Sequence, residues 1–93
     1  MPDKKSIPAL EDFIAHSIRV RVNRYINERG MTKLEFARRT HIAAPTINRL
    51  TNYDVMPSLR SVIMLSLVMG VSVDKLCGVD MIRERMCGNG NGR

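Results

Sequence analysis

The chain has 93 residues, a formal net charge of +6, only 4% aromatic residues and no tryptophan. A chain of this length forms one domain with one core, which leaves no room for a separate ligand-binding domain. Because its apolar residues are mainly Ile, Leu, Val and Met, the composition favours a small all-helical core.

Metal, membrane and enzyme functions find little support. Cys77 and Cys87 lie ten residues apart, and only His16 and His41 could join them, whereas structural zinc usually needs four closely spaced ligands. We therefore expect no metal or other cofactor. No secretory signal is present and no apolar run approaches the roughly 20 residues that cross a bilayer, so we expect a cytoplasmic protein without a membrane partner. No paired acidic site, activated nucleophile or phosphate-cradling glycine loop indicates an enzyme.

The first segment of the chain predicts a flexible arm followed by helix. Residues 1–8 are polar and are expected to form a flexible N-terminal arm. After them, apolar residues recur at helical intervals up to Gly30, which is a typical C-cap. The segment 9–29 is either one long helix or a short leader followed by the first core helix. The stripe consists of Leu10, Ile14, Ile18, Val22, Tyr25 and Ile26.

Residues 33–52 predict a helix-turn-helix. Thr32 and Glu35 form a capping box that fixes the start of the first helix. Pro45 suits the first position of the second helix, which turns Ile47 and Leu50 inward. The small side chain of Ala37 permits a close crossing of the two helices, and Ile42 is the apolar plug of the turn. The inward residues of the first helix are Leu34, Phe36, Ala37 and Thr40.

The remainder of the domain predicts two further core helices. Ser58 caps a helix that ends at Gly70. One face of this helix consists of Leu59, Val62, Ile63, Ser66 and Leu67. Most of its remaining surface is also apolar and consists of Met64, Leu65, Val68 and Met69. A helix apolar nearly all round is either buried or covered by another subunit. Ser72 caps a last core helix that stops at Gly78. Residues 79–87 are expected to form a short extra helix and possible dimer contact, and residues 88–93 a disordered tail.

The excess positive charge coincides with the helix-turn-helix region. From His16 to Arg60 there are nine basic residues against three acidic ones, whereas the rest of the chain is balanced. A solvated basic surface would be an ordinary explanation, but its coincidence with the motif favours binding of a polyanion.

From about Ile18 to about Gly78 the chain resembles helix-turn-helix regulators of the lambda-repressor and Cro (XRE) type. The resemblance rests on the motif together with the Met56-Pro57-Ser58-Leu59 and Gly70-Val71-Ser72-Val73-Asp74 segments. It implies a compact five-helix DNA-binding domain, here residues 9–78. Two positions depart from the family pattern, since His41 replaces the usual turn glycine and Ala43 or Ala44 the usual Ser or Thr cap.

The resemblance also implies how DNA is bound. The second motif helix lies in the major groove of double-stranded DNA. The base-facing positions are Ala44, Pro45, Asn48 and Arg49. Arg49 suits guanine O6 and N7, whereas Asn48 suits adenine or a phosphate. The expected phosphate contacts are Lys33, Arg38, Thr46, Asn52, Tyr53 and Arg60, with Arg38 alternatively facing solvent or pairing with Glu35.

Regulators of this type bind as two-fold dimers, so a homodimer is expected. Its interface is predicted around Met64, Val68, Val73, Met81 and Ile82. The resemblance further implies a transcriptional repressor from a phage or plasmid, with an operator as its partner and no small-molecule ligand.

The main alternative is an antitoxin-like module that sequesters a partner protein and binds DNA secondarily, although the Gly- and Asn-rich end lacks an apolar folding tail. RNA binding would need exposed aromatic side chains for base stacking. A membrane-surface helix over residues 9–29 is less favoured, because the adjacent motif explains its arginines better.

Overall fold

The computed structural model describes residues 3–82, with side chains from residue 9 onward, and all regular secondary structure in this part is helical. The prediction of an all-α domain is confirmed. The helices are α1 (Asp3–Arg29), α2 (Lys33–Thr40), α3 (Ala44–Asn52), α4 (Leu59–Met69) and α5 (Val73–Cys77), and residues 79–82 are helical again. The remainder of the predicted 79–87 helix and the predicted tail 88–93 lie outside the described residues.

Helix α1 is one continuous helix of 27 residues, which decides between the two arrangements considered for residues 9–29. It begins at Asp3, so the prediction of a flexible arm is wrong for residues 3–8. The predicted boundary lay at Pro8, within the helix. Pro8 is the sixth residue of α1 and lacks the N–H that would donate to the carbonyl four residues earlier, yet the helix continues through it.

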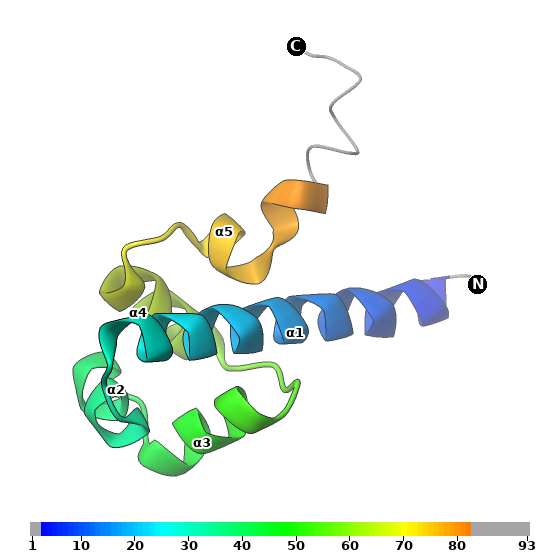
Figure 1. Cartoon of the computed structure of the whole chain (residues 1–93). Coiled ribbons are helices and arrows are strands. Elements are labelled where there is room, and N and C mark those ends of the chain that lie inside the picture. The colour runs from blue at the N-terminus through cyan, green and yellow to red at the C-terminus, as the bar shows by residue number, and fades with distance from the viewer. Residues whose placement is uncertain (1–2, 83–93) are drawn as a thin grey trace.

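Helix α1 forms the central element of the core. Figure 1 shows it running between α3 and α5, and it contacts both helices. Its residues Ile18, Val22 and Ile26 are buried among apolar side chains from all the other helices. Leu10 belongs to the same sequence stripe but is 46% exposed, because the N-terminal part of α1 extends past the other helices.

Helix α2 begins as predicted, since the Thr32 hydroxyl accepts a hydrogen bond from the Glu35 backbone N–H at 3.0 Å. Phe36, Ala37 and Thr40 are buried, but Leu34 is 53% exposed, so its predicted inward position is wrong. Leu34 precedes Phe36 by two residues and therefore points about 200° around the helix from it.

Helices α4 and α5 also begin with side-chain caps. The Ser58 hydroxyl accepts from the Ser61 N–H, and the Ser72 hydroxyl accepts from the Lys75 N–H. The predicted glycine ends are confirmed, because Gly70 and Gly78 both have positive φ. Gly78 packs so tightly that a Cβ would lie 2.8 Å from the Ser17 hydroxyl oxygen of α1.

The two sides of α4 differ in burial. Val62 and Leu65 face the core, whereas Leu59, Ile63 and Leu67 lie on the exposed side. The residues predicted to share one face are thus divided between core and surface. The chain therefore leaves a second apolar face of α4, formed by Leu59, Ile63 and Leu67, open to solvent.

Cys77, the last residue of α5, is a buried thiol. Burial raises the pKa of this thiol above its ordinary value, and the nearby charge of Asp74 raises it further. The neutral thiol is therefore the favoured form, and it packs as a small apolar side chain beside Leu76 in the core.

Candidate nucleic-acid interface

The turn between α2 and α3 holds the two helices at a fixed crossing. His41 adopts the left-handed conformation, with φ 57° and ψ 34°, where the family pattern has glycine. The Ile42 N–H donates to the Ala37 carbonyl at 3.2 Å, and both side chains are buried. The predicted roles of Ile42 as plug and of Ala37 in the crossing thus agree with the packing.

Helix α3 begins without a side-chain cap. Ala43 occupies the cap position and offers no side-chain hydrogen bond. Its carbonyl instead accepts from the backbone N–H groups of Thr46 and Ile47, at 2.9 and 3.1 Å. Pro45 has no N–H to satisfy. Few backbone donors at the start of α3 are therefore left for a cap to satisfy.

One side of α3 is buried and the other is exposed. Ile47, Leu50 and Thr51 are the buried residues, and the Thr51 hydroxyl donates to the Ile47 carbonyl at 2.9 Å. The exposed side, which we call the recognition face, consists of Ala44, Pro45, Asn48 and Arg49. The four predicted base-contacting residues are therefore brought together on one surface of one helix.

The C-terminal end of α3 is tied to α1. The Asn23 side-chain N–H donates to the Thr51 carbonyl at 2.9 Å and to the Arg19 carbonyl at 3.0 Å. In the loop after α3, Asp54 accepts a hydrogen bond from the Arg19 guanidinium. That hydrogen bond, aided by the charges of Arg19 and His16, lowers the pKa of Asp54. The recognition face is thus carried on a helix anchored at both ends.

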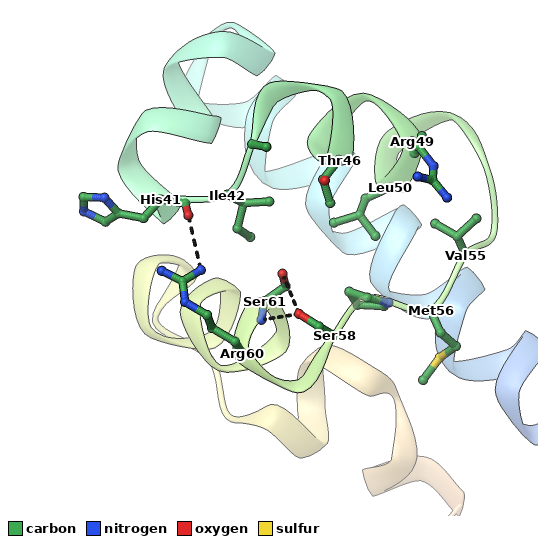
Figure 2. A pocket seen from close by; sticks show the side chains of 12 residues that line it. His41, Ile42, Thr46, Arg49, Leu50, Val55, Met56, Ser58, Arg60 and Ser61 are labelled. Atoms are coloured by element: carbon green, nitrogen blue, oxygen red, sulfur yellow. Dashed lines mark hydrogen bonds between the residues drawn. The ribbon is translucent and has the colours of Figure 1, made fainter.

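A cleft of about 320 Å³ lies between the turn and the start of α4. Figure 2 shows the Arg60 guanidinium reaching across it to the His41 carbonyl, to which it donates at 3.3 Å. Arg49 and the half-buried Thr46 line the α3 side, and Ser58 lines the α4 side. The cleft therefore presents two guanidinium groups and polar side chains next to the recognition face.

Sequence reasoning missed the contact between Arg60 and the turn. The sequence predicts Arg60 only as a phosphate ligand, and nothing in its spacing from His41 indicates that the two residues meet. The contact arises because the turn packs over the first turn of α4, which is a tertiary arrangement.

The other predicted phosphate-contacting residues are exposed. Lys33 and Asn52 lie together, because the Lys33 ammonium donates to the Asn52 side-chain oxygen at 3.3 Å. Tyr53 follows α3 and is 62% exposed. On α2, Arg38 is exposed, whereas its neighbour Arg39 forms an ion pair with Glu35 at 3.9 Å. Of these residues, Lys33 and Asn52 adjoin the recognition face, because the Asn52 side-chain nitrogen donates to the Asn48 side-chain oxygen at 3.1 Å.

The residues predicted for the dimer interface are not equally accessible. Val73 and Met81 are exposed, whereas Met64, Val68 and Ile82 are partly buried. Val68 packs against the core, and its carbonyl accepts a hydrogen bond from the Tyr25 hydroxyl at 3.3 Å. The apolar residues that α4 exposes most are instead those of its second apolar face.

Within residues 3–82 no three His, Cys, Asp or Glu side chains come together as a metal site would require. The same range contains no helix with the length and apolar character needed to span a bilayer.

Comparison with known proteins identifies the family. The model of a helix-turn-helix family, HTH_3, matches residues 22–76, which is more than half of the chain and runs from α1 into α5. Searches of curated proteins and of solved structures gave no significant match. The recognition face, its basic surroundings and the family match agree on one kind of protein. The chain belongs to the HTH_3 family of lambda-repressor/Cro-like (XRE-type) helix-turn-helix proteins, and it is a DNA-binding transcription regulator.

Proposed function

We propose that the protein is a sequence-specific transcriptional repressor that binds a palindromic operator in double-stranded DNA as a homodimer. The observation that carries this proposal is the recognition face, because α3 turns four side chains outward while Ile47 and Leu50 fix the helix in the core. A helix held in this way enters the major groove with its N-terminal residues at the base edges.

Arg49 is the main base-reading residue in this proposal. Its guanidinium is exposed on α3, and a guanidinium matches guanine O6 and N7 with two hydrogen bonds. Ala44 and Pro45 offer apolar contact to a thymine methyl. Because so few polar side chains face the groove, the shape and deformability of the DNA contribute to specificity as well.

Contacts to DNA phosphates would fix the position and orientation of the protein along the duplex. We assign these contacts to Lys33, Arg38, Thr46, Asn52, Tyr53 and Arg60. Lys33 and Asn52 adjoin the recognition face, and Thr46 and Arg60 line the cleft beside it. Such contacts strengthen binding to every sequence and make it dependent on salt.

A homodimer is supported by apolar surface that the monomer leaves uncovered. Val73 and Met81 are exposed, and so are Leu59, Ile63 and Leu67 of the second apolar face of α4. A solvated helix face usually carries charged side chains, and this one does not. Two copies bound to half-sites about 34 Å apart would also combine two small reading surfaces. Light scattering at high micromolar concentration is expected to give twice the monomer mass, and a monomer would refute the dimer.

The test of sequence specificity is selection of bound duplexes from a random library at near-physiological salt. A two-fold palindrome with half-site centres about one helical turn apart is the expected product. Recovery of no motif, with only salt-sensitive binding, would refute specific recognition.

In that case an antitoxin-like role would be tested next by capture of a partner protein. Repression is tested by placing the selected site in a promoter and measuring transcription with and without the protein.

The Arg49→Ala variant tests the placement of the recognition helix. It is expected to cost about 1–3 kcal/mol of binding free energy on the selected site and to relax the preference at one base pair in each half-site. Arg24→Ala is the matched control, since Arg24 lies on α1 beside Met69 and Val71, away from α3. Unchanged affinity and sequence preference in Arg49→Ala would contradict the assignment.

A further inference from the structure

Three side chains form a hydrogen-bonded chain from the first turn of α2 to the recognition face. The Lys33 ammonium Nζ donates to Asn52 Oδ1 at 3.3 Å, and Asn52 Nδ2 donates to Asn48 Oδ1 at 3.1 Å. Asn52 is the last residue of α3, and Asn48 lies one turn before it on the exposed side. A cation on one motif helix is thereby connected to a groove-facing amide on the other.

The chemistry of Lys33 fixes the direction of this chain. An ammonium group has donors only, so the Asn52 amide must turn its oxygen toward Lys33. Its nitrogen then faces Asn48, and the Asn48 amide must turn its oxygen toward Asn52 in order to accept. The opposite orientation of both amides would place the Asn52 nitrogen against the ammonium, where two donors face each other.

As a result, the oxygen of the Asn48 side-chain amide is already hydrogen-bonded, whereas its nitrogen is available to a ligand. Its oxygen is turned toward Asn52, along α3 in the C-terminal direction. Its Nδ2 group, with two hydrogens, is left on the opposite side of the planar amide and has no hydrogen-bond partner among the described residues. That side faces the N-terminal turns of α3, which are the part of a recognition helix that approaches the base edges.

We infer that Lys33 and Asn52 position Asn48 as a hydrogen-bond donor to the major groove, so that this position selects acceptor atoms. Guanine presents two acceptors there, O6 and N7, whereas cytosine presents the N4 donor and would oppose the amide N–H groups. An asparagine free to rotate would instead suit adenine, through one donor and one acceptor. Lys33 and Asn52 are then positioning residues for base choice as well as phosphate ligands. The inference rests on the proposed function.

The experiment repeats the duplex selection with four proteins, which are the wild type, Lys33→Glu, Asn52→Ala and the double variant. In the wild type, guanine is expected over cytosine at one position of each half-site by about three- to tenfold, the range of one hydrogen bond. In Lys33→Glu the new carboxylate would accept from Asn52 Nδ2 and reverse the chain, so that Asn48 presents its oxygen to the groove. The preference at that position should then shift toward cytosine or adenine, which offer N4 and N6 donors.

Two control experiments distinguish an effect of Lys33→Glu on the preferred base from a general loss of affinity caused by the change in charge. Lys75→Glu makes the same charge change at an exposed residue of α5, which lies on the other side of α1 from α3 (Figure 1). It should weaken binding to all sequences without altering the preferred base. In the Asn52→Ala background, Lys33→Glu should no longer change the preference, because the chain is interrupted. Lys33→Met, selected at lower salt, serves if Lys33→Glu binds too weakly, and it should reduce the guanine preference without reversing it.

The outcomes distinguish this inference from the proposed function. If the wild type selects no motif, specific recognition itself fails. If the wild type selects a motif that Lys33→Glu and Lys33→Met leave unchanged at every position, Lys33 does not set the base choice and the inference is overturned. A change in preference that persists equally in the Asn52→Ala background would overturn it as well, since Lys33 would then act without Asn52.

Discussion

The two helices of the motif are nearly equal in length, yet they begin in different ways. Helix α2 starts at a threonine whose hydroxyl accepts a backbone hydrogen bond, whereas α3 starts at Ala43, which has no polar side chain. The start of α3 depends instead on a proline at the second helical position and on one carbonyl that accepts twice. The start of a helix can therefore be satisfied by the backbone alone, and small side chains such as Ala43 and Ala44 can then occupy it.

Among the variants that test this difference between α2 and α3, Thr32→Ala is expected to change the free energy of unfolding most. The change removes the hydroxyl that accepts from the Glu35 N–H, so the free energy of unfolding should fall by about 1 kcal/mol. Urea denaturation followed by circular dichroism measures the loss. A loss near zero would mean that α2 does not depend on its cap, and the contrast with α3 would disappear.

His41→Gly tests the turn that joins the two helices. His41 has a left-handed backbone, which costs an L-residue about 1–2 kcal/mol, while glycine adopts it freely but loses more chain entropy on folding. A net gain in stability of about 0.5–1 kcal/mol is expected, measured as a rise in the denaturation midpoint. A destabilised glycine variant would show that the His41 side chain contributes more than its strain costs.

Ala43→Ser supplies α3 with the cap that the family pattern has. An ordinary cap stabilises by about 1 kcal/mol, but here the gain should stay below about 0.5 kcal/mol, because the Thr46 and Ile47 N–H groups already have an acceptor. The same denaturation assay applies, with Thr32→Ala as the reference for a cap that matters. A gain as large as the Thr32 loss would show that the backbone arrangement does not replace a cap.

The smallest change in stability is expected from the ion pair between Asp54 and Arg19, which follows the C-terminal end of α3, and it depends on pH. The pKa of Asp54 is lowered in the folded protein, so its ion pair with Arg19 contributes stability above the unfolded pKa, and this contribution is lost as pH falls through the folded pKa. Stability measured against pH should therefore be higher for the wild type than for Asp54→Asn near neutrality, and the two curves should converge in acid. Parallel curves at all pH values would exclude this ion pair as a source of the difference.

Much of the fold could be predicted because local signals and tertiary packing agree. Thr32, Ser58 and Ser72 mark helix starts through their own hydroxyls, and Gly70 and Gly78 mark ends through their positive φ. These features depend on a few neighbouring residues, which a sequence displays directly.

The errors occurred where burial depends on elements far away in sequence. Leu10 and Leu34 have apolar side chains at helical spacing, but no other helix of the described chain covers them fully. The spacing of apolar residues along α4 likewise predicts two apolar faces without telling which one meets the core.

The candidate site follows the same division. The exposure of Asn48 and Arg49 could be predicted because Ile47 and Leu50 fix the orientation of α3. The hydrogen-bonded chain from Lys33 could not be predicted, because it joins residues on two helices whose crossing is set by Ala37 and Ile42.

The buried thiol of Cys77 allows separation of α5 from α1 to be measured by the rate at which the thiol is labelled. In the closed domain the thiol is shielded from solvent and largely protonated, so both conditions for alkylation are absent. Once Cys87 is replaced by alanine, the labelling rate of Cys77 reports how often α5 lifts away from α1. Comparison of that rate with global unfolding tells whether the domain opens as a whole or first at its last core helix.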